Sequence, residues 1–174
     1  IINSWDDKTG DVVYLPLAYL KLAQNYSDLK KYREAASYYD QFIKRYPDYA
    51  VLDRVLFRRG AILQKELNDY TEAAIVYETL ARSFPKNIHS DQIQFNLAQV
   101  YRQNNQIKES LDILRQFKND FPGSSILDVV NTELNYIGTY YPEGNNKTTE
   151  RIVYLLGNVI AEKPKDEMLF SYAT

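Results

Sequence analysis

The spacing of apolar residues predicts two consecutive amphipathic helices near the start of the chain. Between Leu15 and Leu29, and again between Tyr32 and Arg45, apolar side chains recur at the i, i+3, i+4 spacing that places them on one helix face. Only a short segment separates the two helices, so they must fold back on each other as an antiparallel pair. The second helix must end before Pro47, because proline lacks the backbone N–H that a helix interior needs.

This helix pair recurs along the chain with a period of 37 to 38 residues. The period is marked by the prolines that end three successive pairs, Pro47, Pro85 and Pro122. Small residues of the first helices follow the same spacing, at Ala23, Gly60 and Ala98. They let helix backbones approach while larger side chains fill the remaining space. Repeats of this length predict a solenoid, because each pair is too small to bury its own apolar face and must pack against its neighbours.

The repeated positions resemble the tetratricopeptide repeat signature, in which an aromatic residue, Leu-Gly, Tyr, Ala, a second aromatic residue and Pro follow at fixed spacing. The first repeat matches at Tyr19, Leu22, Ala23, Tyr26, Tyr32, Ala35, Tyr39 and Pro47. The second matches at Leu56, Gly60, Leu63, Tyr70, Ala73, Tyr77 and Pro85, and the third at Leu97, Ala98, Tyr101, Ser110, Leu114 and Pro122. A fourth, more altered repeat has Leu134, Ile137, Gly138, Tyr141, Ile152, Leu156, Val159 and Pro164.

The resemblance implies an all-α fold, a right-handed superhelical solenoid of antiparallel helix pairs. We expect an array over residues 14–164, with repeats at 16–49, 50–87, 88–124 and 125–164. A segment of residues 1–13 precedes the array. Residues 165–174 begin with apolar, helix-compatible sequence, and two alternatives remain for them: the first helix of a further repeat, or a short capping helix.

The overall composition argues against several kinds of partner. The chain carries 21 Lys and Arg against 23 Asp and Glu, so it lacks the excess of positive charge typical of nucleic-acid-binding proteins. No run of about 18 apolar residues is present, so no membrane-spanning segment is expected. Because the chain has no cysteine, its sequence is compatible with both an oxidising compartment and the cytosol.

Residues that could carry chemistry are scarce. His89 is the single histidine, and without cysteine or a second histidine the chain cannot assemble a multi-histidine metal site or a Cys/His nucleophile pair. Glu34, Glu72 and Glu109 recur at one repeat position, which indicates a solvated helix face or an ion pair within the helix. The sequence therefore predicts no enzyme activity, no metal and no cofactor.

In tetratricopeptide arrays the first helices line a concave groove that receives a segment of a partner protein. The resemblance implies that this groove is formed by Leu20, Gln24, Arg54, Phe57, Arg58, Ala61, Lys65, Phe95, Asn96, Gln99 and Arg102. The apolar series Leu20, Phe57 and Phe95, flanked by arginines and amides, suits a partner with apolar anchors and acidic or carbonyl-rich flanks. The alternative is that Phe57 and Phe95 belong to the core.

Finer features of the repeats favour one group of relatives. Members that clamp chaperone tails carry Lys and Asn where this chain has Leu20 and Gln24, so that activity is disfavoured. Repeats of 37 to 38 residues that end in aromatic-Pro, with Phe42, Leu80 and Phe117 at a usually small position, are similar to bacterial envelope proteins. These are the outer-membrane assembly lipoprotein BamD, the periplasmic Tol-Pal coordinator and the repeat lipoproteins of gliding and type IX secretion.

The resemblance thus implies a non-enzymatic scaffold for protein partners in a multiprotein complex. We expect a periplasmic, outer-membrane-associated location, with a lipid anchor outside this segment; a cytoplasmic location is the alternative. Two other functions stay open: a structural spacer whose repeats stack with neighbouring domains or copies, and an accessory domain of a larger enzyme.

Overall fold

The computed structural model describes residues 14–141, and residues 1–13 and 142–174 lie outside this description. The described residues form seven α-helices and no strand. The helices are α1 (Tyr14–Asp28), α2 (Tyr32–Arg45), α3 (Leu52–Lys65), α4 (Tyr70–Ser83), α5 (Ser90–Gln103), α6 (Ile107–Asp120) and α7 (Leu127–Tyr140). The chain divides into two compact units, residues 1–130 and 131–174.

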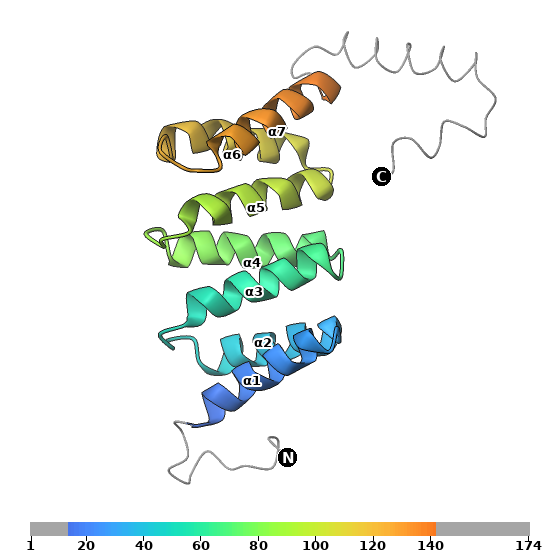
Figure 1. Ribbon diagram of the computed structural model, residues 1–174, viewed down its shortest axis with the longest axis vertical. Coiled ribbons are helices and arrows are strands. Elements are labelled where there is room, and N and C mark those ends of the chain that lie inside the picture. Colours follow the sequence, from blue (N-terminus) through green and yellow to red (C-terminus); the bar gives the residue numbers. More distant parts are fainter. Residues whose placement is uncertain (1–13, 142–174) are drawn as a thin grey trace, which may run out of the picture. The chain divides into compact units, whose positions relative to one another are not determined.

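Within the first unit, α1 to α6 are stacked in chain order as three helix pairs (Figure 1). Each helix from α1 to α5 packs against the helix that follows it in the chain. The pairs are α1 with α2, α3 with α4 and α5 with α6, which are the pairs that the apolar periodicity predicts.

The turn inside each pair is closed in nearly the same way. One residue of the turn has a positive φ, namely Lys30 (57°), Asn68 (53°) and Asn105 (60°). The backbone N–H of the next residue then donates to a carbonyl oxygen of the first helix, from Lys31 to Tyr26 at 2.8 Å, Asp69 to Leu63 at 2.9 Å and Gln106 to Tyr101 at 2.8 Å. These bonds satisfy carbonyl groups that the end of the first helix leaves open. They reverse the chain at the same point of each repeat.

The turn between successive pairs is also repeated. The carbonyl oxygen of the aromatic residue before proline accepts a bond from the N–H three residues later, from Tyr49 to Tyr46 at 3.2 Å, Asn87 to Phe84 at 3.1 Å and Ser124 to Phe121 at 3.1 Å. Proline fits the second position of such a turn, because its fixed φ suits the turn and its missing N–H is not needed there.

Two apolar clusters form the core of the first unit, and α3 contributes to both. Val55 and Ile62 of α3 pack in the first cluster, whose other members are Tyr19, Ala23, Ala35, Ala36, Tyr39 and Phe42. Leu56 and Leu63 pack in the second cluster, with Ala73, Ala74, Val76, Tyr77, Leu80, Ile93, Leu97 and Val100. Because both long faces of α3 are covered by neighbours, the pairs share their apolar surfaces as a solenoid requires.

Gly60 shows why small residues recur in the first helices. A Cβ atom added at this position would lie 2.9 Å from Cζ of the Tyr77 ring. Tyr77 is fully buried, so its ring has no free space into which it could withdraw. The glycine therefore allows α3 and α4 to approach each other.

The predicted fourth repeat is described only in part. Its expected first helix corresponds to α7, in which Ile137 is buried. Its expected second helix and residues 165–174 fall outside the described residues, as does the segment 1–13. The division of the chain into four repeats therefore stays a prediction. None of the described helices has the length and apolar character needed to cross a membrane.

Candidate binding groove

Two adjoining cavities lie along α3, one on each side of the helix. The first has a volume of about 500 Å³ and is lined by Leu17, Leu20, Lys21, Gln24, Tyr39, Val51, Arg54, Val55 and Arg58. The second has a volume of about 590 Å³ and is lined by Asp53, Arg54, Phe57, Arg58, Asn87, Ile88, His89, Gln92 and Ile93. Arg54 and Arg58 line both cavities, so the two spaces adjoin at these residues. We call the two cavities together the α3 groove.

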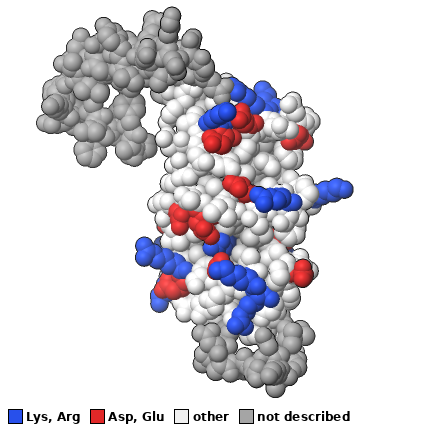
Figure 2. Space-filling view, turned by 180° about the vertical axis from the view of Figure 1, so that it is seen from behind, with Lys and Arg blue, Asp and Glu red and all other residues white. Residues whose placement is uncertain are grey.

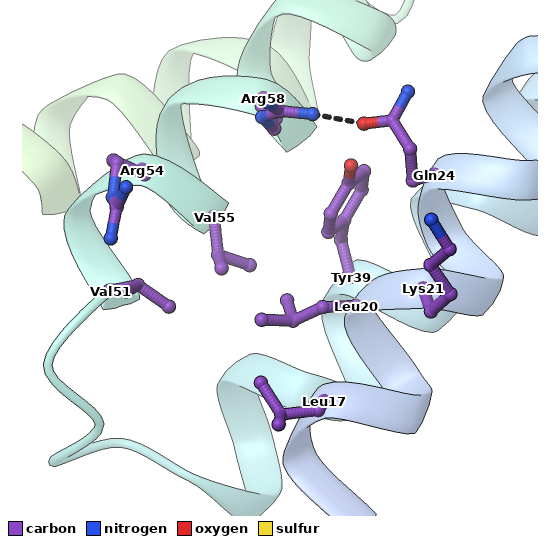
Figure 3. A pocket seen from close by; sticks show the side chains of 9 residues that line it. All are labelled: Leu17, Leu20, Lys21, Gln24, Tyr39, Val51, Arg54, Val55 and Arg58. Carbon is purple, nitrogen blue, oxygen red and sulfur yellow. Dashed lines mark hydrogen bonds between the residues drawn. The ribbon is translucent and has the colours of Figure 1, made fainter.

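The first cavity has an apolar interior and a polar rim. Leu17 and Leu20 project from α1 toward Val51 and Val55 of α3, and the ring of Tyr39 closes the space between them (Figure 3). Half of the Leu17 surface is exposed, at 50%. The cavity therefore offers apolar surface that a partner side chain could cover.

Gln24 orients one of the two shared arginines. Its side-chain oxygen accepts a hydrogen bond from Nη1 of Arg58, across the space between α1 and α3 (Figure 3). Its side-chain nitrogen donates to Oδ1 of Asp28 at 2.8 Å. The amide thus connects a carboxylate on α1 to a guanidinium on α3, and holds Arg58 at the rim of the cavity.

The loop before α5 forms one wall of the second cavity. Nδ2 of Asn87 donates to Oδ2 of Asp53 at 2.7 Å, and Oδ1 of Asn87 accepts from the backbone N–H of His89 at 2.8 Å. These two bonds hold the loop against the first turn of α3, and we call them a loop clip. Ile88 lies between the bonded residues and is 89% exposed, so the loop presents an apolar side chain at the cavity.

The same clip occurs one repeat later. The Ser124 hydroxyl donates to Oδ2 of Asp91 at 2.6 Å, and it accepts from the backbone N–H of Ile126 at 3.3 Å. The sequence signal for these bonds is an aspartate in the first turn of a first helix, followed 33 or 34 positions later by a short polar residue.

The basic residues of the groove form no ion pair with another residue in the part of the chain that the structure describes. Lys44–Asp40, Arg59–Asp40 and Arg59–Glu72 are ion pairs outside the groove. Lys21, Arg54 and Arg58 line it, whereas Asp53 is the one carboxylate among the lining residues of the two cavities. The groove therefore combines apolar walls with an excess of positive charge.

Five of the eleven predicted groove residues line these cavities. They are Leu20, Gln24, Arg54, Phe57 and Arg58. Ala61, Lys65, Gln99 and Arg102 belong to the same first helices but line neither cavity. The open space lies closer to the N-terminal ends of the first helices than the predicted series does. Sequence reasoning accordingly missed Leu17, Lys21, Val51 and Val55, although helical spacing from Leu20, Gln24 and Arg54 identifies their faces.

Phe95 and Asn96, which were also predicted, are buried. Phe95 is 7% exposed and Asn96 is 4% exposed, so neither presents much surface to a partner. Nδ2 of Asn96 donates to the Tyr77 hydroxyl at 3.3 Å, and this bond joins α5 to α4. For Phe95 the burial agrees with the alternative that it belongs to the core. Phe57 is half-buried, packs against the second cluster and also lines the second cavity.

The recurring glutamates also differ from expectation at one position. Glu34 and Glu109 are exposed, as a solvated face requires. Glu72 instead accepts from Nη2 of Arg59 at 2.8 Å, and Arg59 also lies 3.4 Å from Asp40. The ion pair therefore connects α4 to α3 and does not lie within one helix.

The described residues do not bring together three His, Asp or Glu side chains that could hold a metal ion. Figure 2 shows acidic and basic side chains interspersed over the described part of one face of the molecule. The arrangement along α3 is suited to binding by apolar contact and by charge.

Antiparallel helix pairs that stack in chain order define an all-α solenoid. A family model described as tetratricopeptide repeat matches residues 17–49, 54–87 and 92–124. The chain therefore belongs to the tetratricopeptide repeat family, as its repeated residues predict.

Solved structures share this fold. The chain is similar to "MamA 41-end from Desulfovibrio magneticus RS-1", with a TM-score of 0.60 and 15% identity, over 86% of this chain and 78% of that chain. It is also similar to "MamA RS-1 ArsTM double mutant", with a TM-score of 0.61 and 16% identity, over 95% of this chain and 84% of that chain. At this identity the likeness establishes the solenoid fold alone. No curated protein matches the chain.

Proposed function

We propose that this protein is a non-enzymatic scaffold that holds a segment of a partner protein in the α3 groove. The observation that carries the proposal is the pair of adjoining cavities with apolar walls, together with basic rim residues that have no acidic partner among the described residues. Binding of protein partners is also the activity typical of the tetratricopeptide repeat family.

The composition of the groove matches the way protein interfaces concentrate their affinity. A few residues, most often aromatic or arginine, account for most of the binding free energy when they become buried. Phe57, Arg54 and Arg58 lie together on α3 and are partly or largely exposed. A partner that covered these residues would exclude water from the apolar contacts and from the charged hydrogen bonds. Exclusion of water strengthens hydrogen bonds to charged groups.

The direct test is the double substitution Phe57→Ala with Arg58→Ala. If each truncation costs about 2 kcal/mol, partner affinity falls more than about a hundredfold. The tagged protein, the double variant and a matched control, Leu29→Ala with Arg82→Ala, are used to recover partners from the native source. The control removes an exposed apolar residue and an exposed arginine outside the groove. We expect the control to recover the partners of the parent protein and the groove variant to lose them.

Circular dichroism distinguishes loss of binding from loss of folding. Phe57 packs edge to face against Tyr77, with ring centroids 6.1 Å apart, so its truncation could lower the melting temperature. The variant Arg54→Gln with Arg58→Gln changes only exposed side chains and keeps the packing. If this folded variant binds the same partners with unchanged affinity, the α3 groove is not the binding surface.

We further propose that the scaffold acts in a bacterial cell-envelope assembly, secretion or motility complex, in the periplasm and associated with the outer membrane. Support comes from the aromatic-Pro ends of the repeats, which form one repeated turn, and from the buried Phe42, Leu80 and Phe117. Fractionation of source cells, followed by immunoblotting, should place the protein in the envelope fraction. Recovery in the cytoplasmic fraction would contradict this location and leave the binding function untouched.

A further inference from the structure

We infer that the α3 groove recognises an extended peptide segment in which one carboxylate side chain lies between two large apolar side chains. The inference rests on the proposed function and specifies the chemistry of the partner. In sequence terms the segment is apolar, any residue, Asp or Glu, any residue, apolar.

The order of the three side chains follows from the position of the two shared arginines. Arg54 and Arg58 are four residues apart on α3, so they lie on one face of the helix, one turn apart. Both residues line the first cavity and both line the second. A ligand that occupied both cavities must therefore cross these arginines between its two apolar contacts.

Each cavity has the walls that an apolar side chain requires. The first is bounded by Leu17, Leu20 and Val55, and the second by Phe57 and Ile93. Volumes of about 500 and 590 Å³ leave room in each for a large side chain with part of its backbone.

The distance between the cavities fits alternate residues of an extended chain. Cavities on opposite sides of one helix are separated by about the helix diameter, roughly 10–12 Å with side chains. In an extended segment, residues i, i+2 and i+4 point to the same side, and i and i+4 are about 13 Å apart. Residues i and i+4 can thus enter the two cavities, while residue i+2 faces the arginines.

The charges at the crossing favour a carboxylate. Arg58 is held in place by Gln24, and Arg54 makes no ion pair with any described residue. Asp53 lies beside the second cavity, but its oxygens already accept from Nδ2 of Asn87 at 2.7 Å and from the backbone N–H of Arg54 at 2.7 Å. Two guanidinium groups against this one carboxylate leave the crossing with a net positive charge. Guanidinium groups bind carboxylates with charge-assisted hydrogen bonds.

The test uses synthetic peptides with blocked ends and a fluorescent label, measured by anisotropy with the full chain. The core peptide is Leu-Ser-Glu-Ser-Leu between flexible Gly-Ser flanks. Three comparison peptides isolate each feature: Leu-Ser-Gln-Ser-Leu lacks the charge, Ser-Ser-Glu-Ser-Ser lacks the apolar anchors, and Leu-Ser-Leu-Ser-Glu has the same composition in another order.

We expect the core peptide to bind at least about tenfold more tightly than each comparison peptide. Arg54→Gln should reduce the preference for glutamate over glutamine, and Arg54→Gln with Arg58→Gln should remove it. Both variants should keep the preference for leucine over serine. The matched control Arg33→Gln removes an exposed arginine outside the groove, and it should keep both preferences. The preference for glutamate should also weaken as the salt concentration rises.

Equal binding of the reordered peptide would overturn the inferred order of side chains. A preference for glutamate that survives in Arg54→Gln with Arg58→Gln would overturn the role of the arginines. If no peptide binds while native partners are still lost from the Phe57→Ala, Arg58→Ala variant, the recognition pattern is wrong and the proposed function stands. If that variant also keeps its native partners, both are wrong.

Discussion

The interior of a repeat and the junction between repeats are held together differently. Inside the second repeat, α3 and α4 meet through size matching, with Gly60 beneath the ring of Tyr77. At the junctions, polar side chains complete the contact: Arg59 reaches Asp40 at 3.4 Å between the first two repeats, and Asn96 donates to Tyr77 at 3.3 Å between the next two. At Gly60 the interior depends on side-chain volume, although Arg59 also bonds Glu72 there. At the junctions, hydrogen bonds and charge add to apolar packing that neighbouring repeats share.

The two kinds of contact should respond differently to mutation and to solvent. A side chain that is too large for the interior should destabilise the protein at any salt concentration or pH, because the ring that it contacts is buried. A junction with a charged pair should depend on salt, and a junction with a buried phenol should depend on pH.

The largest effect is expected at Gly60. Gly60→Leu would push a branched side chain into the Tyr77 ring, which is 2.9 Å from the position of a Cβ atom. Overpacking of this kind typically costs about 1–3 kcal/mol, and we expect the upper end of that range because Tyr77 is fully buried. Urea unfolding monitored by circular dichroism gives the free energy of unfolding.

Gly138→Ala is the control for this change. Gly138 occupies the corresponding signature position in α7 but is exposed, so alanine should stabilise that helix by about 0.5–1 kcal/mol through its higher propensity. If Gly60→Leu left the unfolding midpoint unchanged, the size-matching explanation of the repeat interior would be incorrect.

The next effect concerns the charged junction. Arg59→Met keeps the apolar stem but removes the guanidinium, which bonds the partly exposed Asp40 and Glu72; the Arg59 side chain as a whole is 13% exposed. We expect a loss of about 1–2 kcal/mol, below the cost for a fully buried pair because both carboxylates contact solvent. The same measurement in 1 M salt should show a smaller loss, since salt screens the pair.

Lys44→Met provides the comparison for Arg59→Met. Lys44 lies 2.6 Å from the same Asp40, but its side chain is 74% exposed. Its removal should cost at most a few tenths of a kcal/mol. Equal losses for the two variants would show that the first junction does not depend on its buried guanidinium.

A smaller effect at neutral pH is expected at the phenol of the second junction. Tyr77→Phe removes the hydrogen bond from Asn96 and should cost about 1 kcal/mol at pH 7. Burial raises the pKa of the Tyr77 hydroxyl from 10.0 to about 12, although the bond from Asn96 acts in the opposite direction. Between these two values the unfolded chain releases this proton while the folded protein keeps it.

The stability of the protein should therefore fall as the pH rises from 10 to 12. The contribution from Tyr77 is fully present below pH 10 and decreases by at most about 1.4 kcal/mol per pH unit above it. Tyr77→Phe should have a shallower dependence of the free energy of unfolding on pH over this range. The same slope in both proteins would contradict the burial argument. Burial also raises the pKa of Tyr101, whose hydroxyl donates to Glu78 at 2.6 Å, so part of the slope should remain.

The difference between interior and junction also explains what the sequence could predict. The small and aromatic positions recur with the repeat because every pair needs the same internal packing, so the periodicity predicted the three pairs and the buried small residues. The junction partners vary from one repeat to the next. Arg59 and Asn96 are polar residues of first helices, and their burial depends on which side chain the preceding repeat offers.

The candidate site was predicted only in part for a related reason. Face assignments along α1 and α3 follow from helical spacing, so Leu20, Gln24, Arg54 and Arg58 of the predicted series line the cavities. The second cavity depends on a loop whose conformation is set by Asn87, and no helical periodicity describes it. Phe95 was predicted to line the groove but is buried. An aromatic residue on a first helix fits the pattern of a groove residue as well as that of a core residue.

A small effect on stability is also expected at the loops before α5 and α7, which are held by equivalent hydrogen bonds. Asn87→Ala removes the bonds to Asp53 and to the His89 N–H, and Ser124→Ala removes the equivalent bonds to Asp91 and to the Ile126 N–H. Because these groups are near solvent, each variant should lose only about 0.5–1 kcal/mol.

The two clips should differ in binding, because only the first one shapes the α3 groove. Asn87 and Ile88 line the second cavity, whereas Ser124 lines neither cavity. Asn87→Ala should weaken capture of a native partner several-fold, since the loop must then be ordered on binding, and Ser124→Ala should leave it unchanged. Equal capture by both variants, each with its small loss of stability, would show that the loop is not part of the binding surface. The groove would then be confined to α1 and α3.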